Sequence, residues 1–260
     1  MANVDSPSAP LAGATVLVTR PAGHGAAFAR RARALGAAIV ALPGLSLRPP
    51  ADADAARAAL RAAAAFDGAI FVSPVAVARA FALLPALHVP AAFGVGAGTV
   101  RALARHGLRG HAPRERADSE GLLALPDFAD VRGHRYALVG APGGRDLIAP
   151  TLRARGAEVV PIHVYERAPP RLTRRHFDAL AQAAAPLLLP LSSAEALGHL
   201  VALLPPPLLE RLRTQLVVAS SARLAELART HGFTDVTEAA SALSADLLAA
   251  AARALARHRL

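Results

Sequence analysis

A strand–helix–strand pattern occurs twice in this sequence, and it restricts the possible folds more than any other feature. The β-branched run Thr15–Val18 leads through a Pro/Gly turn into an amphipathic helix pattern that Gly36 ends. Tyr136–Val139 opens the same pattern, which Gly156 ends 120 residues after Gly36. Strands that alternate with amphipathic helices are typical of parallel sheets covered on both faces. The sequence therefore predicts an α/β fold with two similar domains.

Two further units are repeated in the same order. Asp67–Ala76 and Pro186–Ala194 each show a strand pattern, a turn that contains serine, and the start of a helix. Ala92–Thr99 and Leu216–Ala222 repeat a strand, a turn of small residues and a helix. Each unit of one half thus has a counterpart in the other half, which supports two domains of one architecture.

The composition excludes several kinds of chemistry. The chain has 260 residues, no cysteine and no lysine, so its positive charge is all arginine. It therefore lacks a thiolate nucleophile, a disulfide framework, a lysine Schiff base and a Walker A lysine. The absence of cysteine is compatible with a reducing cytoplasm. Residues 1–11 show neither a cationic start nor a long apolar run, so we expect a disordered tail, no secretory signal and a cytoplasmic protein.

The net charge of +10 predicts anionic partners. The arginines are spread singly along the chain and aromatic residues make up only 4% of it, which is not typical of a nucleic-acid-binding protein. No apolar run approaches the roughly 20 residues that a membrane span needs. We therefore expect a small polyanionic ligand, with no nucleic acid and no membrane as partner. A monomer is the expected state, because no uncovered apolar stripe stands out.

Ligands of parallel α/β domains bind beyond the carboxyl ends of the strands, where helices begin with unpaired backbone N–H groups. Six turns of this sequence have that position, and all are small, hydroxyl-bearing or glycine-rich. Each is also an ordinary helix N-cap pattern, but six of them in two facing lobes favour a common ligand cleft. The candidate binding residues are Thr19, Arg20, Ser73, Gly96, Ala97, Gly98, Thr99, Gly143, Gly144, Arg145, Ser192, Ser193, Ser220, Ser221 and Arg223.

The better-known ligand motifs are incomplete. Gly94–Thr99 resembles a dinucleotide fingerprint, but its third glycine comes one place too early. Gly140–Gly144 lacks the Lys-Ser/Thr of a P-loop. The ten histidines show no metal-ligand spacing on a predicted helix, so we expect no metal site. One distinctive group remains, the phenol of Tyr165 in an extended stretch between the two halves.

Several short motifs follow one another in a specific order and spacing, among them Val16–Pro21, Ile70–Pro74, Gly94–Gly96, Gly143–Arg145, Val164–Arg167, Ser192–Ser193 and Val217–Gly232. In this order and spacing the chain resembles the uroporphyrinogen-III synthase family from about Ala14 to Leu255. The resemblance implies two flavodoxin-like domains with parallel sheets, joined by a two-stranded β-ladder. The second domain, residues 51–160, is then inserted into the first, residues 12–43 plus 170–260, with linkers at 44–50 and 161–169. The repeats alone allow two consecutive domains equally well.

The resemblance also implies a reaction. Such an enzyme is a lyase of haem biosynthesis: it cyclises hydroxymethylbilane, a linear tetrapyrrole with eight carboxylates, to uroporphyrinogen III. It inverts the last ring and loses water, without a cofactor. A phenol is a plausible proton donor to the leaving hydroxyl, so Tyr165 is the expected catalytic residue. Transient contact with the preceding enzyme of the pathway is also expected.

Two alternatives from other classes stay open at this point. One is a non-enzymatic two-lobed sensor or carrier that closes on a small anion. The other is a nicotinamide-dependent oxidoreductase that uses the Gly94 turn. Product analysis with hydroxymethylbilane, together with a nicotinamide titration, distinguishes these three functions.

Overall fold

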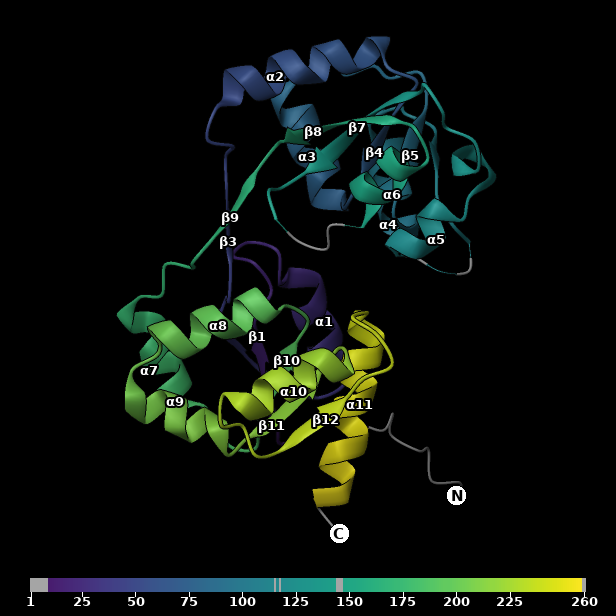
Figure 1. Ribbon diagram of the computed structural model, residues 1–260. Helices are drawn as coiled ribbons and strands as arrows, with labels where there is room; N and C mark the ends of the chain where they lie inside the picture. Colours follow the sequence, from purple (N-terminus) through teal and green to yellow (C-terminus); the bar gives the residue numbers. More distant parts are fainter. Residues whose placement is uncertain (1–8, 115, 117, 144–146, 259–260) are drawn as a thin grey trace, which may run out of the picture. The chain divides into compact units, whose positions relative to one another are not determined.

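The computed structural model describes residues 9–114, 116, 118–143 and 147–258 (Figure 1). The chain divides into two compact units, one that contains residues up to Ser46 and from Ala168 onward, and one that contains Leu47–Arg167. Of the expected tail, residues 1–8 lie outside the described part. The expected disordered tail of residues 1–11 is wrong at Leu11. The side chain of Leu11 is fully buried, and its backbone N–H donates to Leu35 O at 2.9 Å.

The first unit is built on a five-stranded sheet in the order β12-β11-β10-β1-β2, with all neighbours parallel. Its strands are β1 Thr15–Val18, β2 Ala38–Ala41, β10 Leu187–Leu191, β11 Leu216–Ala219 and β12 Val236–Glu238. Its helices are α1 Ala26–Ala34, α7 Arg174–Gln182, α8 Ala194–Leu203, α9 Pro206–Arg213, α10 Ala222–Thr230 and α11 Ser244–His258.

Helices cover both faces of this sheet, because successive strand residues point to opposite sides. Leu188 of β10 packs in one hydrophobic cluster with residues of α1 and α11. Its neighbours Leu187 and Leu189 pack in another cluster, with residues of α7, α8, α9 and α10. The continuous apolar run of β10 thus serves two cores at once, which explains why it does not alternate between apolar and polar residues.

A proline interrupts the hydrogen-bond ladder in the middle of this sheet. Pro190 lies in the central strand β10 but has no N–H to donate. The β1–β10 register accordingly extends over Thr15–Leu187 and Val16–Leu188 only. Beyond that point the hydroxyl of Thr19 donates to Pro190 O at 2.8 Å, in a buried position. A side-chain hydrogen bond therefore connects the two strands where the backbone ladder has ended.

Replacing Thr19 by valine is expected to lower the free energy of unfolding by about 1–2 kcal/mol. Valine keeps the shape but leaves the buried carbonyl of Pro190 without this donor. Urea unfolding measures the effect, with Thr15→Val in the same strand as the control, because the described hydrogen bonds of Thr15 involve only its backbone. Equal stability of the two variants would show that the Thr19 hydroxyl is not needed.

The second unit contains another parallel sheet, in the order β6-β5-β4-β7-β8. Its strands are β4 Gly68–Phe71, β5 Ala92–Gly94, β6 Gly110–His111, β7 Arg135–Gly140 and β8 Glu158–His163. Its helices are α2 Ala53–Ala62, α3 Pro74–Leu83, α4 Ala97–Arg105, α5 Ser119–Leu123 and α6 Ile148–Ala154, with short 3-10 turns at Ala63–Ala65 and Pro126–Phe128. Phe71 packs in a cluster with α2, α3 and α4, and Ile70 packs in the cluster that holds α5 and α6.

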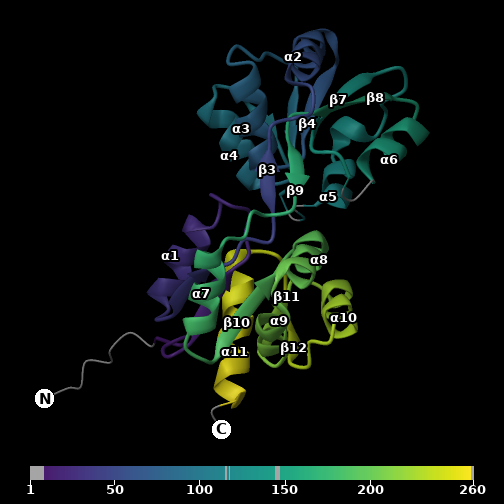
Figure 2. The same ribbon diagram turned by 90° about the vertical axis from the view of Figure 1, so that its left-hand side faces the viewer.

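A small two-stranded sheet connects the units: β3 Ser46–Arg48 leads into the second unit and β9 Glu166–Ala168 leads back (Figures 1 and 2). The expected α/β class, with two parallel sheets and a two-stranded ladder, is confirmed. Among the described helices, none has the length and apolarity required to cross a bilayer.

Candidate active site

The candidate turns of the first unit follow three adjacent strands. Thr19 and Arg20 come after β1, Ser192 and Ser193 after β10, and Ser220 after β11. Because these strands are parallel and neighbouring strands lie about 4.8 Å apart, their carboxyl ends bring the turns together at one edge of the sheet. The structure therefore brings these three turns together within the first unit.

Three of the candidate serines begin helices. The side-chain oxygens of Ser73, Ser193 and Ser221 accept hydrogen bonds at 3.1, 3.2 and 3.4 Å from the backbone N–H groups of Ala76, Ala196 and Leu224. Each of these contacts is an N-cap. A capping hydroxyl still has its own hydrogen to donate, so a carboxylate can bind to it without breaking the cap.

Arg20 has several partners within its own unit. Its Nη1 donates to Ser192 Oγ and its Nη2 to the backbone oxygen of Ala242, both at 3.1 Å. The guanidinium carbon lies 5.6 Å from the ring centre of Phe28, and burial lowers the pKa of Arg20 from its ordinary value. Arg20 thus ties the turn after β10 to the loop before α11. Arg223, by contrast, is exposed near the start of α10.

The second unit shows the same arrangement at its own carboxyl edge. Ser73 follows β4, Gly96 follows β5, Gly143 follows β7 and Tyr165 follows β8. These four strands are adjacent in the order β5-β4-β7-β8, so the four segments lie at one edge of the sheet. The candidates Gly144 and Arg145 lie outside the described residues.

The turn from β5 into α4 offers backbone donors rather than side chains. Gly96 is the N-cap of α4, and the N–H groups of Ala97 and Gly98 in the first turn have no partner within the helix. Thr99 was predicted as a binding residue, but it is only 3% exposed, and its methyl group lies against Gly94 of β5. Thr99 therefore contributes to packing, while Ala97 and Gly98 present the donors.

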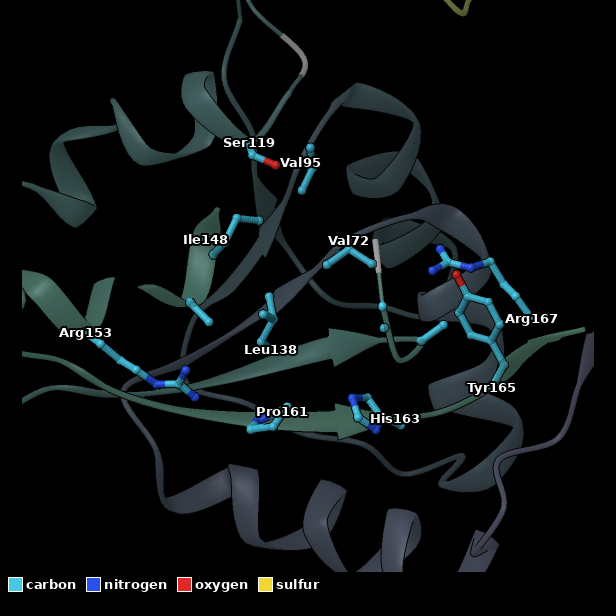
Figure 3. A pocket seen from close by; sticks show the side chains of 14 residues that line it. Val72, Val95, Ser119, Leu138, Ile148, Arg153, Pro161, His163, Tyr165 and Arg167 are labelled. Atoms are coloured by element: carbon cyan, nitrogen blue, oxygen red, sulfur yellow. The ribbon is translucent and has the colours of Figure 1, made fainter. Parts of the chain in front are cut away.

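A cavity of about 430 Å³ opens at this edge (Figure 3). It lies between the turns after β4, β5, β7 and β8, the start of α5, and α6. Its lining residues are Val72, Val95, Ser119, Leu138, Gly140, Ala141, Gly143, Ile148, Ala149, Arg153, Pro161, His163, Tyr165 and Arg167. The lining is thus an apolar floor with a phenol, an imidazole and two guanidinium groups.

Four of these side chains come from one extended stretch. Pro161, His163, Tyr165 and Arg167 are spaced two residues apart from β8 to β9, and all four line the cavity (Figure 3). The sequence analysis selected only Tyr165 and missed His163, Arg167 and Arg153. The signal that could have found the first two is this spacing, since each lies two residues from the tyrosine.

The two tyrosines of the chain have different environments. Tyr165 is 6% exposed and lines the cavity. Tyr136 packs among Phe93 and Phe128, and its hydroxyl lies 3.3 Å from His134 Nδ1. The pKa of Tyr136 is raised, first by burial and then by the negative charges of Asp67 and Asp127. Tyr165 is the tyrosine positioned to reach a ligand in the cavity.

Arg167 holds one wall of the cavity in place. Its Nη2 donates to the backbone oxygen of Pro142 at 3.0 Å, which ties β9 to the turn after β7. Gly143 in that turn has a φ of 71°, a conformation that favours glycine, and a Cβ there would lie 3.3 Å from the same nitrogen. On the other side, Arg153 Nη2 donates to Val159 O at 2.9 Å. In the described residues, no group of three or more His, Cys, Asp or Glu is arranged to bind a metal.

Comparison with known proteins decides between the alternatives that the sequence left open. The family model "Uroporphyrinogen-III synthase HemD" matches residues 26–249. The uroporphyrinogen-III synthases of Salmonella typhimurium and Escherichia coli are each 33% identical over 251 residues, which is 91% of this chain and 99% of each relative. The chain belongs to the uroporphyrinogen-III synthase family. The expected family, reaction class and place in tetrapyrrole biosynthesis are confirmed, and the sensor and oxidoreductase alternatives are set aside.

Solved structures of uroporphyrinogen-III synthases share the fold. A mutant form from Thermus thermophilus matches with a TM-score of 0.59 at 22% identity, over 95% of this chain and 100% of that one. The Helicobacter pylori structure matches with a TM-score of 0.60 at 15% identity, over 91% of this chain and 97% of that one. At these identities the likeness establishes the architecture, while residue roles in the present chain must come from its own geometry.

Proposed function

We propose that this uroporphyrinogen-III synthase homologue binds the hydroxymethyl end of hydroxymethylbilane in the cavity at the carboxyl edge of the second unit. The observation that carries the proposal is the meeting of a nearly buried phenol, Tyr165, with Arg153 and Arg167 around one apolar floor. Pyrrole rings fit the floor, and guanidinium groups form paired hydrogen bonds with the ring carboxylates.

Tyr165 acts as the general acid. Its O–H donates a proton to the hydroxyl of the substrate, the carbon–oxygen bond breaks, and water leaves. The electron pair of the adjacent pyrrole stabilises the resulting cation. The substituted α-carbon of the last ring then attacks this cation and becomes quaternary. Its bond to the original bridging methylene breaks, so that methylene becomes the new cation and the last ring turns over. The unsubstituted α-carbon of the ring attacks this second cation, and loss of the proton on that carbon restores the aromatic pyrrole. Because the substrate supplies the electrons, the protein chiefly positions the chain ends and delivers one proton.

The remaining candidates hold carboxylates. In the second unit these are the backbone N–H groups of Ala97 and Gly98 and the hydroxyl of Ser73. In the first unit they are the hydroxyls of Ser192, Ser193, Ser220 and Ser221, with Arg223 as an exposed charge. Their location at the carboxyl edges of two parallel sheets supports this assignment. Arg20 keeps the turn after β10 in place through its contacts with Ser192 and Ala242.

Replacing Arg20 by either lysine or glutamine is expected to lower kcat/KM about tenfold. Neither side chain reproduces the fork that reaches both Ser192 and Ala242, although lysine keeps the positive charge. Steady-state assays of both variants therefore separate positioning from direct charge recognition. Near-normal activity of Arg20→Lys together with a large loss in Arg20→Gln would mean that Arg20 itself binds a carboxylate.

The isomer of the product tests the proposed function. Purified protein is mixed with freshly made hydroxymethylbilane, and the products are oxidised to porphyrins and separated. Without enzyme, ring closure gives the symmetric isomer, so the expected result is a shift to the inverted isomer III. A parallel nicotinamide fluorescence titration is expected to show no change. If the symmetric isomer forms at the rate of the protein-free control, the proposal is wrong.

For its setting in the cell, we propose a cytoplasmic monomer that contacts the preceding pathway enzyme only transiently. The absence of cysteine in a chain of 260 residues supports a reducing compartment. Light scattering coupled to size-exclusion chromatography tests the monomer, for which the expected mass is 26.7 kDa.

A further inference from the structure

A second concave surface lies beside the edge strand β6 of the same unit. Its larger hollow, of about 650 Å³, is lined by Arg101, Arg109 and Arg114, which we call the arginine groove. A hollow of about 450 Å³ continues it and shares Arg114 and Leu125 with the first. The three arginines come from α4, from the residue before β6 and from the loop after it, so three separate segments converge on one surface.

The arginine groove carries an excess of positive charge. Arg101, Arg109 and Arg114 are all exposed, and none of them forms an ion pair with any residue in the described ranges. One described acidic side chain lines each hollow, Asp127 the larger and Glu120 the smaller. Asp127 lies 3.7 Å from His111, and Glu120 lies 3.4 Å from Arg116. Among the described residues, the larger hollow therefore has three guanidinium groups against one carboxylate, that of Asp127.

The groove and the candidate active-site cavity adjoin each other. Val95 lines the cavity and Ala97 lines the groove, so only the β5–α4 turn separates them. At the start of α5, Ser119 lines the cavity while Glu120 lines the smaller hollow. A ligand longer than the cavity can therefore extend past the β5–α4 turn or past the start of α5 into the groove.

The size of the cavity favours such an extension. Its volume of about 430 Å³ is near the lower end of the range that holds a drug-sized ligand, about 300–1,000 Å³. Hydroxymethylbilane has four pyrrole rings, each with two carboxylate side chains, and the cavity accommodates only part of it. The carboxylates of the remaining rings need cationic partners elsewhere.

We infer that the arginine groove is a binding site for the carboxylates of those rings of the linear tetrapyrrole that lie outside the cavity. This inference rests on the proposed function and adds the residues that recognise the length and charge of the substrate. The arginines touch no reacting atom, so they determine affinity and leave the chemical step to the cavity. Arginine suits this role because its fork matches a carboxylate in both geometry and charge.

The triple variant R101Q/R109Q/R114Q tests the groove. We expect its KM for hydroxymethylbilane to rise about tenfold in low salt, with kcat within about twofold of wild type. The difference in KM is expected to shrink at about 0.5 M salt, because screening shortens the range of exposed charges. The matched control is R30Q/R31Q/R33Q, which removes the same charge from exposed positions of α1 in the first unit and leaves KM within about twofold.

The outcomes separate this inference from the proposed function. If wild type forms isomer III but both triple variants share its KM, the groove has no role and the inference is overturned. If wild type forms no isomer III, the proposed function fails. Binding of uroporphyrin I, a closed octacarboxylate followed by its own fluorescence, then decides the groove. Weaker binding in R101Q/R109Q/R114Q alone supports it, and equal binding in both variants overturns it.

Thermal unfolding checks that the variants fold, and the single variant R109Q provides a milder second test.

Discussion

Replacing Tyr165 by phenylalanine is expected to lower kcat about 100-fold, which corresponds to about 2.7 kcal/mol of transition-state stabilisation. The ring stays in the apolar wall, so KM is expected to change little. Only the proton donor to the leaving hydroxyl is removed. Single-turnover measurements with fresh hydroxymethylbilane give the rate of the chemical step directly and avoid limitation by product release.

The matched control is Tyr136→Phe, since Tyr136 is the only other tyrosine in the sequence. Its ring packs within the second unit and its hydroxyl meets His134, away from the cavity lining. We expect this variant to keep the kcat of wild type. Turnover of Tyr165→Phe within about twofold of wild type, a difference below about 0.5 kcal/mol, would show that Tyr165 is not the acid.

Replacing Gly44 by alanine is expected to destabilise the first unit by about 2–3 kcal/mol, which lowers the melting temperature by roughly 5–10 °C. A Cβ at Gly44 would lie 2.5 Å from the Cβ, 3.0 Å from the Cα and 3.1 Å from the backbone oxygen of Ala196. Two of these atoms are backbone, so relief requires α8 to move. Gly44 is fixed on its other side as well, because its N–H donates to Thr19 O at 3.1 Å and its oxygen lies 2.9 Å from His199 Nδ1.

Gly198→Ala provides a control of opposite sign on the same helix. A Cβ at Gly198 meets nothing within 4 Å, and alanine favours the helix over glycine by about 0.5–1 kcal/mol. Thermal unfolding followed by circular dichroism is therefore expected to show a lower transition temperature for Gly44→Ala and a higher one for Gly198→Ala. A shift of both in the same direction would mean that the contact between Gly44 and α8 is not the cause.

The architecture could be predicted because local signals and the fold agree. The glycines that end the first helix of each repeat, Gly36 and Gly156, have φ values of 90° and 92°, a conformation that stops a helix and that other residues rarely adopt. The strand patterns likewise fall within the two sheets. Repeated local signals thus specified the number and type of units, whereas the end of the tail depended on the burial of Leu11, which only tertiary packing reveals.

The site could be predicted only in part. The turns after the strands were found because parallel strands always bring their carboxyl ends to one edge. The environment of Arg20 was not predictable, since its partners Ser192 and Ala242 lie 172 and 222 residues away in the sequence. Arg153 was missed for a similar reason: α6 must fold against β8 before its guanidinium reaches the cavity.

Hydrogen–deuterium exchange of the protein with and without uroporphyrinogen III, under anaerobic conditions, tests the central claim most directly. That claim is that the tetrapyrrole binds at the carboxyl edge of the second unit's sheet. We expect the product to slow exchange in residues 72–74, 95–99, 140–143 and 163–167, which form that edge. The opposite edge, residues 66–68 and 134–136, is expected to stay unchanged. Protection at the opposite edge without protection at the carboxyl edge would contradict the account.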